Sequence, residues 1–261
     1  MGAIGTAGPA TADEDGRPLA TWGFWESMGM FLLGNIVLGA VVAGGLIYTL
    51  YGITTVGSEG ARTPDVVATI AADIVFVATM VVWLSIRHKR WRETMGLPRR
   101  DRFWRDLGFG VLAGIVIYIL AAVVIGVILT LFYRVVLGRP VTTPPQLSPH
   151  LSAGAKVLAA VLALVVAPIT EEFFFRGVLF GGMRDRHGFW PAALVSSLLF
   201  GLAHWEGPWQ DALLLTSVMC FTGFGLAWVY DRRRSLTAAV ATHMTFNVIG
   251  VILIFSGIVF R

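Results

Sequence analysis

Long apolar runs, separated by short polar loops, repeat along almost the whole sequence after residue 21. Most of these runs exceed the roughly 20 residues that an α-helix needs to cross the hydrocarbon core of a bilayer. Seven runs can be counted: 28–51, 66–86, 107–133, 157–183, 188–204, 212–230 and 235–260. Because backbone polar groups must be satisfied internally in lipid, we predict an all-α fold, a polytopic transmembrane bundle of about seven helices.

The composition excludes an ordinary soluble domain. Of the 261 residues, 56% are hydrophobic and 14% are charged, whereas a soluble domain carries about 25% charged residues. The net charge of +4 comes from residues distributed among the loops, so no nucleic-acid partner is expected. The single cysteine, Cys220, rules out an internal disulfide and a cysteine-based metal site.

The domain organisation follows from the same pattern. Residues 1–21 are small, polar and acidic, so we expect a disordered tail rather than a signal peptide, followed by a single integral membrane domain at 22–261. Fourteen of the twenty Lys and Arg residues lie in the tail and in alternate loops, eight of them between Arg87 and Arg105. The positive-inside rule therefore predicts a cytoplasmic N terminus in a multi-pass protein of the cell (inner) membrane.

Tryptophans and spaced glycines give two further structural expectations. Tryptophan rings prefer the headgroup layer, and eight of the nine lie at or near the ends of the runs. They are Trp22, Trp25, Trp83, Trp91, Trp104, Trp190, Trp205 and Trp209. The spacings Gly110/Gly114 and Gly177/Gly181 predict close approach of helices.

Few ionisable or strongly polar side chains lie inside the runs. Each of them is a candidate functional group, because a buried charge in lipid is costly and usually faces a partner or water. They are Asp73, Glu171, Glu172, Arg176, His204, His243 and Asn247. Asp73 has no partner visible in the sequence, so it receives no catalytic role.

Three of these groups lie within six residues of the fourth run. Glu172 and Arg176 are four residues apart on one helix face, where they can form an ion pair. Glu171 lies about 100° around the helix and cannot share that arginine in the same way. We therefore interpret the pair as structural and Glu171 as a carboxylate free to act as a general base. A charge network that only holds helices together is the alternative.

Two histidines and one asparagine are the remaining candidate functional groups. His204 follows Phe200 by four residues in the fifth run, and Asn247 follows His243 by four in the seventh. An imidazole and a carboxamide one turn apart can donate hydrogen bonds to a developing oxyanion. Alternatively, the two histidines and Glu171 supply the three protein ligands of a catalytic zinc ion. Counted from the starts of their runs, Glu171, His204 and His243 lie at different depths in the bilayer, so we expect helix tilt to make up a difference of about 5–10 Å.

Taken in order, these motifs resemble those of the CAAX protease and bacteriocin-processing (CPBP, or Abi) family of intramembrane proteases, which includes the CaaX prenyl endopeptidases. The strings are EEFFFR at 171–176, FGLAH at 200–204 and HMTFN at 243–247. They cover about residues 160–250, in a motif-bearing core of about 157–261. The resemblance implies an intramembrane endopeptidase acting on a peptide or membrane-protein substrate in the lipid bilayer.

The resemblance also implies roles for the matching residues. Glu171 activates water with the help of His204, while His243 and Asn247 bind the oxyanion and the Glu172/Arg176 pair positions the site. The family is described both as metalloproteases and as metal-free glutamate proteases, so hydrolysis is expected with or without zinc. Two other classes remain open from the residues alone: a proton-coupled transporter that uses the buried cluster as a relay, and a non-catalytic membrane scaffold.

Overall fold

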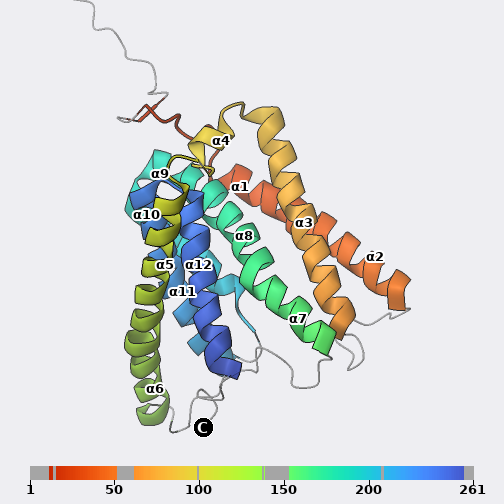
Figure 1. Cartoon of the computed structure of the whole chain (residues 1–261), viewed down its shortest axis with the longest axis vertical. Helices are drawn as coiled ribbons and strands as arrows, with labels where there is room; N and C mark the ends of the chain where they lie inside the picture. Colours follow the sequence, from red (N-terminus) through yellow and green to blue (C-terminus); the bar gives the residue numbers. More distant parts are fainter. Residues whose placement is uncertain are drawn as a thin grey trace, which may run out of the picture.

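The computed structural model describes residues 12–13, 16–51, 62–98, 100–136, 138, 153–206 and 209–255. These residues form a bundle of helices, some of them strongly inclined to one another (Figure 1). The α-helices are α1 (Phe24–Phe31), α2 (Ala40–Tyr51), α3 (Arg62–Arg87), α4 (Trp91–Thr94), α5 (Phe103–Leu120), α6 (Gly126–Val135), α7 (Ala153–Val161), α8 (Ala167–Glu172), α9 (Gly181–His187), α10 (Phe189–Ala203), α11 (Trp209–Arg233) and α12 (Leu236–Phe255). The predicted all-α polytopic bundle is confirmed.

Four π-helical segments join α-helices into longer rods. They are Leu32–Gly39 between α1 and α2, Ala121–Ile125 between α5 and α6, Leu162–Val166 between α7 and α8, and Phe173–Phe180 between α8 and α9. A π-helical turn inserts residues without ending the helix, so each rod continues through the bilayer while its side-chain register shifts.

Six helices in the described part of the chain are long and apolar enough to cross a membrane. They are Phe24–Thr49, Asp65–Arg87, Phe103–Val135, Gly154–His187, Ala212–Arg233 and Leu236–Leu253. The fifth predicted run, 188–204, forms α10, which has 15 residues. At 1.5 Å per residue it is about 22 Å long, less than the ~30 Å of the hydrocarbon core. A helix of this length that starts near the membrane surface ends inside the bilayer.

Helix α5 packs along α12 over the first predicted glycine pair. A Cβ at Gly110 would lie 2.5 Å from a backbone carbonyl oxygen of α12, and one at Gly114 would lie 2.6 Å from another. Both glycines therefore allow the two backbones to approach closely, as their spacing predicts. Gly177 instead faces the side chain of Met95, and a Cβ at Gly181 would lie nearest the carbonyl oxygen of Arg176 in the same rod, so the second pair makes no comparable contact with another backbone.

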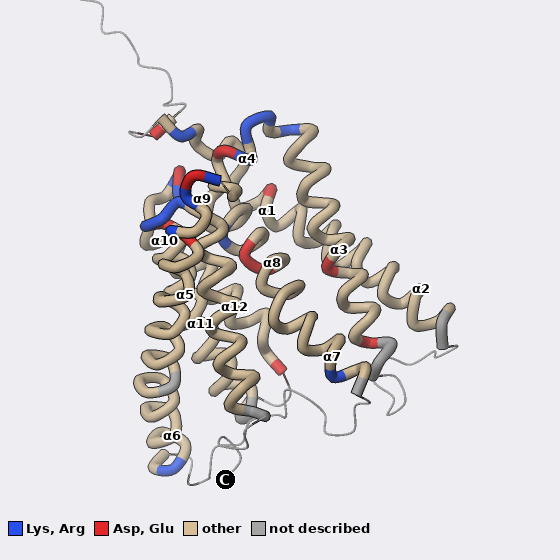
Figure 2. The backbone as a smooth tube through the Cα atoms, in the orientation of Figure 1, with Lys and Arg blue, Asp and Glu red and all other residues tan. Residues whose placement is uncertain are grey.

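The basic loops that were predicted to share one side meet at one end of the bundle. Figure 2 shows that most Lys and Arg positions along the backbone lie at the top of the view, which we call the basic end. Arg184 Nε lies 2.8 Å from Asp231 Oδ1, and Arg102 donates to the carbonyl oxygen of Arg233 at 3.4 Å. The assignment of this end to the cytoplasm stays a prediction.

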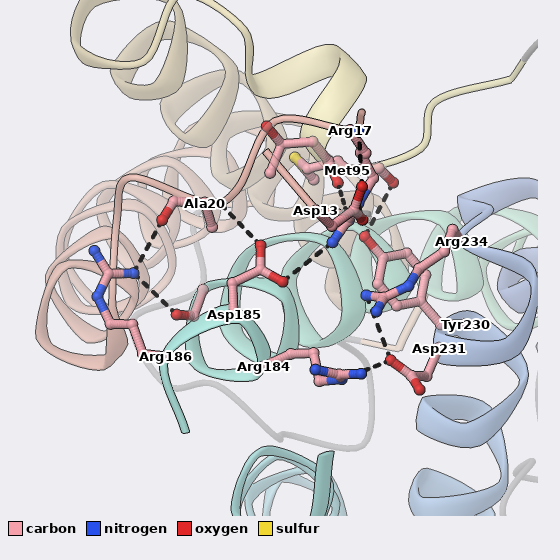
Figure 3. Close-up of polar contacts among 12 residues, drawn as sticks. Asp13, Arg17, Ala20, Met95, Arg184, Asp185, Arg186, Tyr230, Asp231 and Arg234 are labelled. Carbon is pink, nitrogen blue, oxygen red and sulfur yellow. Dashed lines mark hydrogen bonds and ion pairs between the residues drawn. The ribbon is translucent and has the colours of Figure 1, made fainter. Parts of the chain in front are cut away.

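Part of the N-terminal tail, which we predicted to be disordered over residues 1–21, contacts the bundle. Residues 1–11, 14 and 15 lie outside the described ranges, but Gly16–Thr21 is bound to the bundle. Arg17 forms ion pairs with Asp13 at 3.0 Å and Asp185 at 3.1 Å, and the buried Ala20 donates its N–H to Asp185 at 2.8 Å (Figure 3). Asp185 lies more than 160 residues away, so local composition did not reveal this contact.

Two of the tryptophans expected in the headgroup layer are core residues instead. Trp22 is 1% exposed and donates its indole N–H to the carbonyl oxygen of Val178 at 2.8 Å, and Trp91 is 5% exposed. Five others are exposed, as the prediction requires: Trp25, Trp104, Trp190, Trp205 and Trp209. Burial of Trp22 is tolerated because its polar N–H has a hydrogen-bond partner.

Candidate active site

The two adjacent glutamates lie at the junction of α8 and the π-helical segment Phe173–Phe180. π-helical turns inside α-helices occur frequently at functional sites. The side chain of Glu172 is fully buried, whereas that of Glu171 is 26% exposed. One carboxylate is therefore sealed in the protein, and the other is partly exposed, although its Oε2 is buried and has no hydrogen-bond partner among the described residues.

Glu172 is held by two partners. Its Oε1 lies 3.0 Å from Arg176 Nη1 and 2.9 Å from His243 Nδ1. Arg176 also donates to the carbonyl oxygen of Gly223 at 3.1 Å, and its guanidinium carbon lies 4.5 Å from the centre of the Phe200 ring. The predicted Glu172/Arg176 pair is confirmed, and it connects α8 and the following π-helical segment with α10, α11 and α12.

The hydrogen bonds at Nδ1 assign a tautomer to both histidines. His204 Nδ1 lies 2.8 Å from the carbonyl oxygen of Phe200, which can only accept, so this nitrogen carries the hydrogen. His243 Nδ1 lies beside Glu172. Because Glu172 is paired with Arg176, its carboxylate accepts a hydrogen bond, and so His243 Nδ1 also carries the hydrogen. In the neutral rings, each Nε2 therefore presents a lone pair.

These two Nε2 atoms converge on Glu171. His204 Nε2 and His243 Nε2 each lie 3.9 Å from Glu171 Oε2. That distance is too long for a direct hydrogen bond, and a carboxylate with two neutral imidazoles offers only acceptors. A water molecule can bridge such a gap because it donates to acceptors on both sides. The arrangement can therefore hold a water molecule beside a general base.

The helix connection at Gly188 brings Glu171 and His204 to the same depth. Gly188 has a φ of +79°, a conformation that glycine adopts readily, and it joins α9 to α10. It lies 17 residues after Glu171 and 16 residues before His204. At 1.5 Å per residue, Glu171 and His204 each lie roughly 25 Å from Gly188, along two helices that run in opposite directions. Their expected mismatch in depth arose from counting each run from its own first residue.

Asn247 follows His243 by one turn of α12, as the sequence pattern predicted. Its Nδ2 donates to the carbonyl oxygen of Ala163 at 2.8 Å. This bond ties α12 to the π-helical segment Leu162–Val166 and uses one of the two hydrogens on the amide nitrogen. The joint oxyanion-binding role of His243 and Asn247 stays a prediction.

Asp73 lies closer to the site than the sequence indicated. Helices α3 and α8 run in the same direction, and the rings of Phe76 and Phe174 lie 5.3 Å apart. Asp73 and Glu171 each precede these phenylalanines by three residues, so they fall at the same level on neighbouring helices. The two carboxyl groups interact electrostatically. A sequence pattern does not reveal which helix packs against α3, and so this neighbour was missed.

The expected zinc ligands are Glu171, His204 and His243. Hydrogen bonds from Nδ1 to an oxygen are typical of metal-binding histidines. Among the residues that the structure describes, however, no three His, Cys, Asp or Glu side chains are placed to hold one metal ion. The residues as arranged therefore do not form a three-ligand zinc site, and zinc binding stays a prediction.

Fold and site together define a polytopic helical membrane protein with a glutamate and two histidines gathered inside the bundle. Residues 153–249 match the family model described as type II CAAX prenyl endopeptidase Rce1-like. The matched segment contains all three motifs, so the resemblance predicted from the sequence is confirmed over these residues.

Curated relatives extend the match beyond the motifs. The chain is 28% identical over 181 residues to a Bacillus subtilis (strain 168) protein named "Putative membrane peptidase YdiL", covering 69% of each chain. It is 27% identical over 139 residues to UPF0177 protein YxdF of Lactococcus lactis, covering 53% of this chain and 73% of the relative. No solved structure matches significantly. The comparisons support a membrane protease at the level of the family.

Proposed function

We propose that this chain is an intramembrane endopeptidase in which Glu171, assisted by His204, activates water to hydrolyse a peptide bond. One observation carries the proposal: two histidine Nε2 atoms from different helices face the same oxygen of Glu171 at 3.9 Å. A structural charge network needs only the buried Glu172/Arg176 pair. Glu171 and His204 are partly exposed, and the buried Oε2 of Glu171 has no hydrogen-bond partner among the described residues, which supports a role beyond packing.

The hydrolysis follows from the positions of these groups. Glu171 accepts a proton from the water molecule while the water oxygen attacks the carbonyl carbon of the scissile bond. The tetrahedral intermediate then breaks its C–N bond, and the proton passes to the nitrogen of the leaving amine. His204 orients the water, because its Nδ1 bond to Phe200 fixes the ring with Nε2 toward Glu171. General-base assistance of this kind contributes about 10²–10⁴-fold to the rate.

His243 and Asn247 stabilise the oxyanion in this proposal. A donor at His243 Nε2 requires the imidazolium form, whose charge the carboxylate of Glu172 balances from the other side of the ring. Asn247 contributes the amide hydrogen that is not bound to Ala163. Glu172 and Arg176 act through His243 and are positioning residues rather than groups that touch the substrate.

The substrate class follows from the family match and the surroundings. The site lies among membrane-spanning helices, so its substrate is a peptide or membrane protein within or beside the bilayer. Two probes separate the main options: a quenched fluorescent peptide with a farnesylated C-terminal CaaX sequence, and an unlipidated transmembrane peptide of equal length. Cleavage of either one by purified, reconstituted protein supports an endopeptidase.

The test compares Glu171→Gln and His204→Ala with the wild type on whichever probe is cleaved. We expect kcat to fall at least about 100-fold in both variants, because each loses a group that acts on the water. Glu206→Gln is the matched control, since this exposed glutamate lies only two residues beyond His204 and should leave kcat unchanged. Wild-type turnover in a folded Glu171→Gln variant would overturn the proposal.

Metal dependence is tested on the same preparation. Metal analysis of the pure protein is combined with a chelator and with re-addition of zinc. A metal-free glutamate mechanism predicts unchanged turnover after chelation. Loss of bound zinc together with activity, and recovery of both on re-addition, would instead establish the zinc mechanism.

A further inference from the structure

A polar cavity lies at the basic end of the bundle and contains none of the active-site residues. Its volume is about 440 Å³, large enough for a charged headgroup. The cationic lining residues are Arg17, Arg102, Arg232, Arg233 and Arg234, and the acidic ones are Asp13, Glu93 and Asp106. Five arginines against three acids leave an excess of positive charge around the cavity.

Three of the five arginines are paired with carboxylates. Arg17 contacts Asp13 at 3.0 Å and Asp185 at 3.1 Å. Arg233 holds Asp106 through two nitrogens, at 2.5 Å and 3.1 Å. Arg234 lies 3.4 Å from Asp231 Oδ1, which also binds Arg184 (Figure 3).

Arg102 and Arg232 have no such partner among the described residues. Arg102 is half-buried, and its one hydrogen bond in the described structure goes to a backbone carbonyl oxygen at 3.4 Å. The positive charges are also crowded: burial and the neighbouring charge of Arg17 lower the pKa of Arg234, although Asp231 opposes the shift. An anion in the cavity would relieve this repulsion.

The walls of the cavity are fixed by a close backbone crossing. Gly96 has a φ of +61°, and a Cβ there would clash with the carbonyl oxygen of Arg234. Leu236 donates its N–H to the Gly96 carbonyl oxygen at 3.0 Å. Arg234 itself has a φ of +48°, which is uncommon for a residue other than glycine. The cavity is therefore a built feature of the fold.

Exposed tryptophans place this end of the bundle at the membrane surface. Trp104 is 76% exposed and follows Arg102 by two residues, and Trp25 is 83% exposed at the start of the first membrane-spanning helix. Tryptophan rings settle in the headgroup layer. A ligand that reaches the cavity from the bilayer therefore presents its headgroup rather than its acyl chains.

We propose that the cavity binds a phosphate group, supplied by the headgroup of an anionic phospholipid. Guanidinium groups bind phosphate oxygens with two parallel hydrogen bonds, and Arg102 and Arg232 are available to do so. Arg17 and Asp13 come from the N-terminal tail, and the remaining walls come from α4, the loop that follows it, the first turn of α5, and the end of α11 with the turn to α12. A bound phosphate would therefore fasten the tail to the helices that pack around α12.

The test measures thermal unfolding of the full chain purified in a neutral detergent. Phosphatidylglycerol, phosphatidylcholine and inorganic phosphate are added separately, with potassium chloride at matched ionic strength as the reference. A ligand that binds only the folded protein raises Tm. We expect phosphatidylglycerol to raise Tm by several degrees and phosphatidylcholine to leave it unchanged, with one phosphatidylglycerol bound per chain by native mass spectrometry.

The variant Arg102→Gln/Arg232→Gln should lose most of the Tm increase and the bound lipid. Arg105→Gln is the control, because Arg105 is exposed in the same region but does not line the cavity. If the double variant does not fold, Arg232→Gln alone carries the test, since that side chain is exposed. An equal loss in Arg105→Gln, or no increase with any phosphate compound, would overturn the proposal. An equal increase with inorganic phosphate would overturn the lipid as its source.

Discussion

Neighbouring glutamates have opposite environments because a helix separates them by about 100°. Glu172 points into the bundle, where Arg176 and His243 neutralise and orient it. Glu171 points toward the meeting place of two imidazoles and remains partly exposed. One short sequence thereby supplies both a fixed support for the site and a reactive carboxylate.

Removing one partner of the buried pair should destabilise the fold strongly. Arg176→Met leaves the carboxylate of Glu172 fully buried without its main counter-charge. Breaking a buried ion pair in this way costs about 3–5 kcal/mol. The free energy of unfolding can be measured by titrating a denaturing detergent into mixed micelles and following circular dichroism.

The double variant Glu172→Gln/Arg176→Met separates charge from packing. It removes both charges, so it should recover a large part of the stability lost in Arg176→Met. It should remain inactive or weakly active, because His243 loses the carboxylate that orients its ring. A loss below about 1 kcal/mol in Arg176→Met would show that water already reaches Glu172 and that the pair is not buried in solution.

At the level of elements, the packing of α5 against α12 positions the active-site residues of α12. α12 carries His243 and Asn247, and it lies against the two glycines of α5. The depth and rotation of these two side chains therefore depend on a helix that has no catalytic group of its own.

Adding one methyl group at this contact should reduce both stability and activity. In Gly114→Ala the new Cβ meets a carbonyl oxygen of α12 at about the 2.6 Å found for an ideal Cβ, so the helices must separate. Overpacking of this kind costs about 1–3 kcal/mol. We expect a lower Tm and a several-fold lower kcat, measured by thermal unfolding and by the cleavage assay.

Gly108→Ala is the matched control on the same helix. A Cβ at Gly108 has no atom within 4 Å, so the substitution should be neutral or stabilise α5 by up to about 1 kcal/mol. Equal losses in Gly108→Ala and Gly114→Ala would show that the α5–α12 contact does not control the outcome, because Gly108 lies outside that contact.

The sequence predicted those features that depend on neighbours three or four residues away. The ion pair of Glu172 and Arg176 and the close approach at Gly110 and Gly114 are of this kind, since helix geometry alone determines which residues share a face. The shared depth of Glu171 and His204 was missed, because it depends on how two helices join at a turn. Long-range packing also determines the neighbour of Asp73, and no local pattern encodes it.

At the scale of the whole molecule, the N-terminal tail closes the basic end of the bundle. Through Arg17 it is attached to Asp185 of α9 and to the carbonyl oxygen of Thr94. The ordered tail also lines the cavity that we assign to phosphate. Conditions that release the tail should therefore open this end without disturbing the membrane-spanning helices.

Acidification should weaken one of the attachments of the tail. Burial tends to raise the pKa of Asp13, but the hydrogen bonds and the charge of Arg17 outweigh it and hold this pKa below its ordinary value of 3.8. A carboxyl whose pKa is lowered by folding contributes its full stabilisation above its unfolded pKa and loses it as the pH falls through the folded pKa. The attachment is therefore complete at neutral pH and weakens below about pH 4.

Hydrogen exchange of the peptide that covers residues 16–22 tests this prediction, after correction for the intrinsic effect of pH on exchange. At pH 7 the wild type should be better protected than Asp13→Asn, which lacks the carboxylate that Arg17 binds. The difference should shrink as the pH falls below 4, because the wild-type carboxyl then becomes neutral as well. The link to Asp185 is present in both proteins, so the comparison isolates Asp13. Equal protection of the two proteins at pH 7 would show that Asp13 does not hold the tail in place.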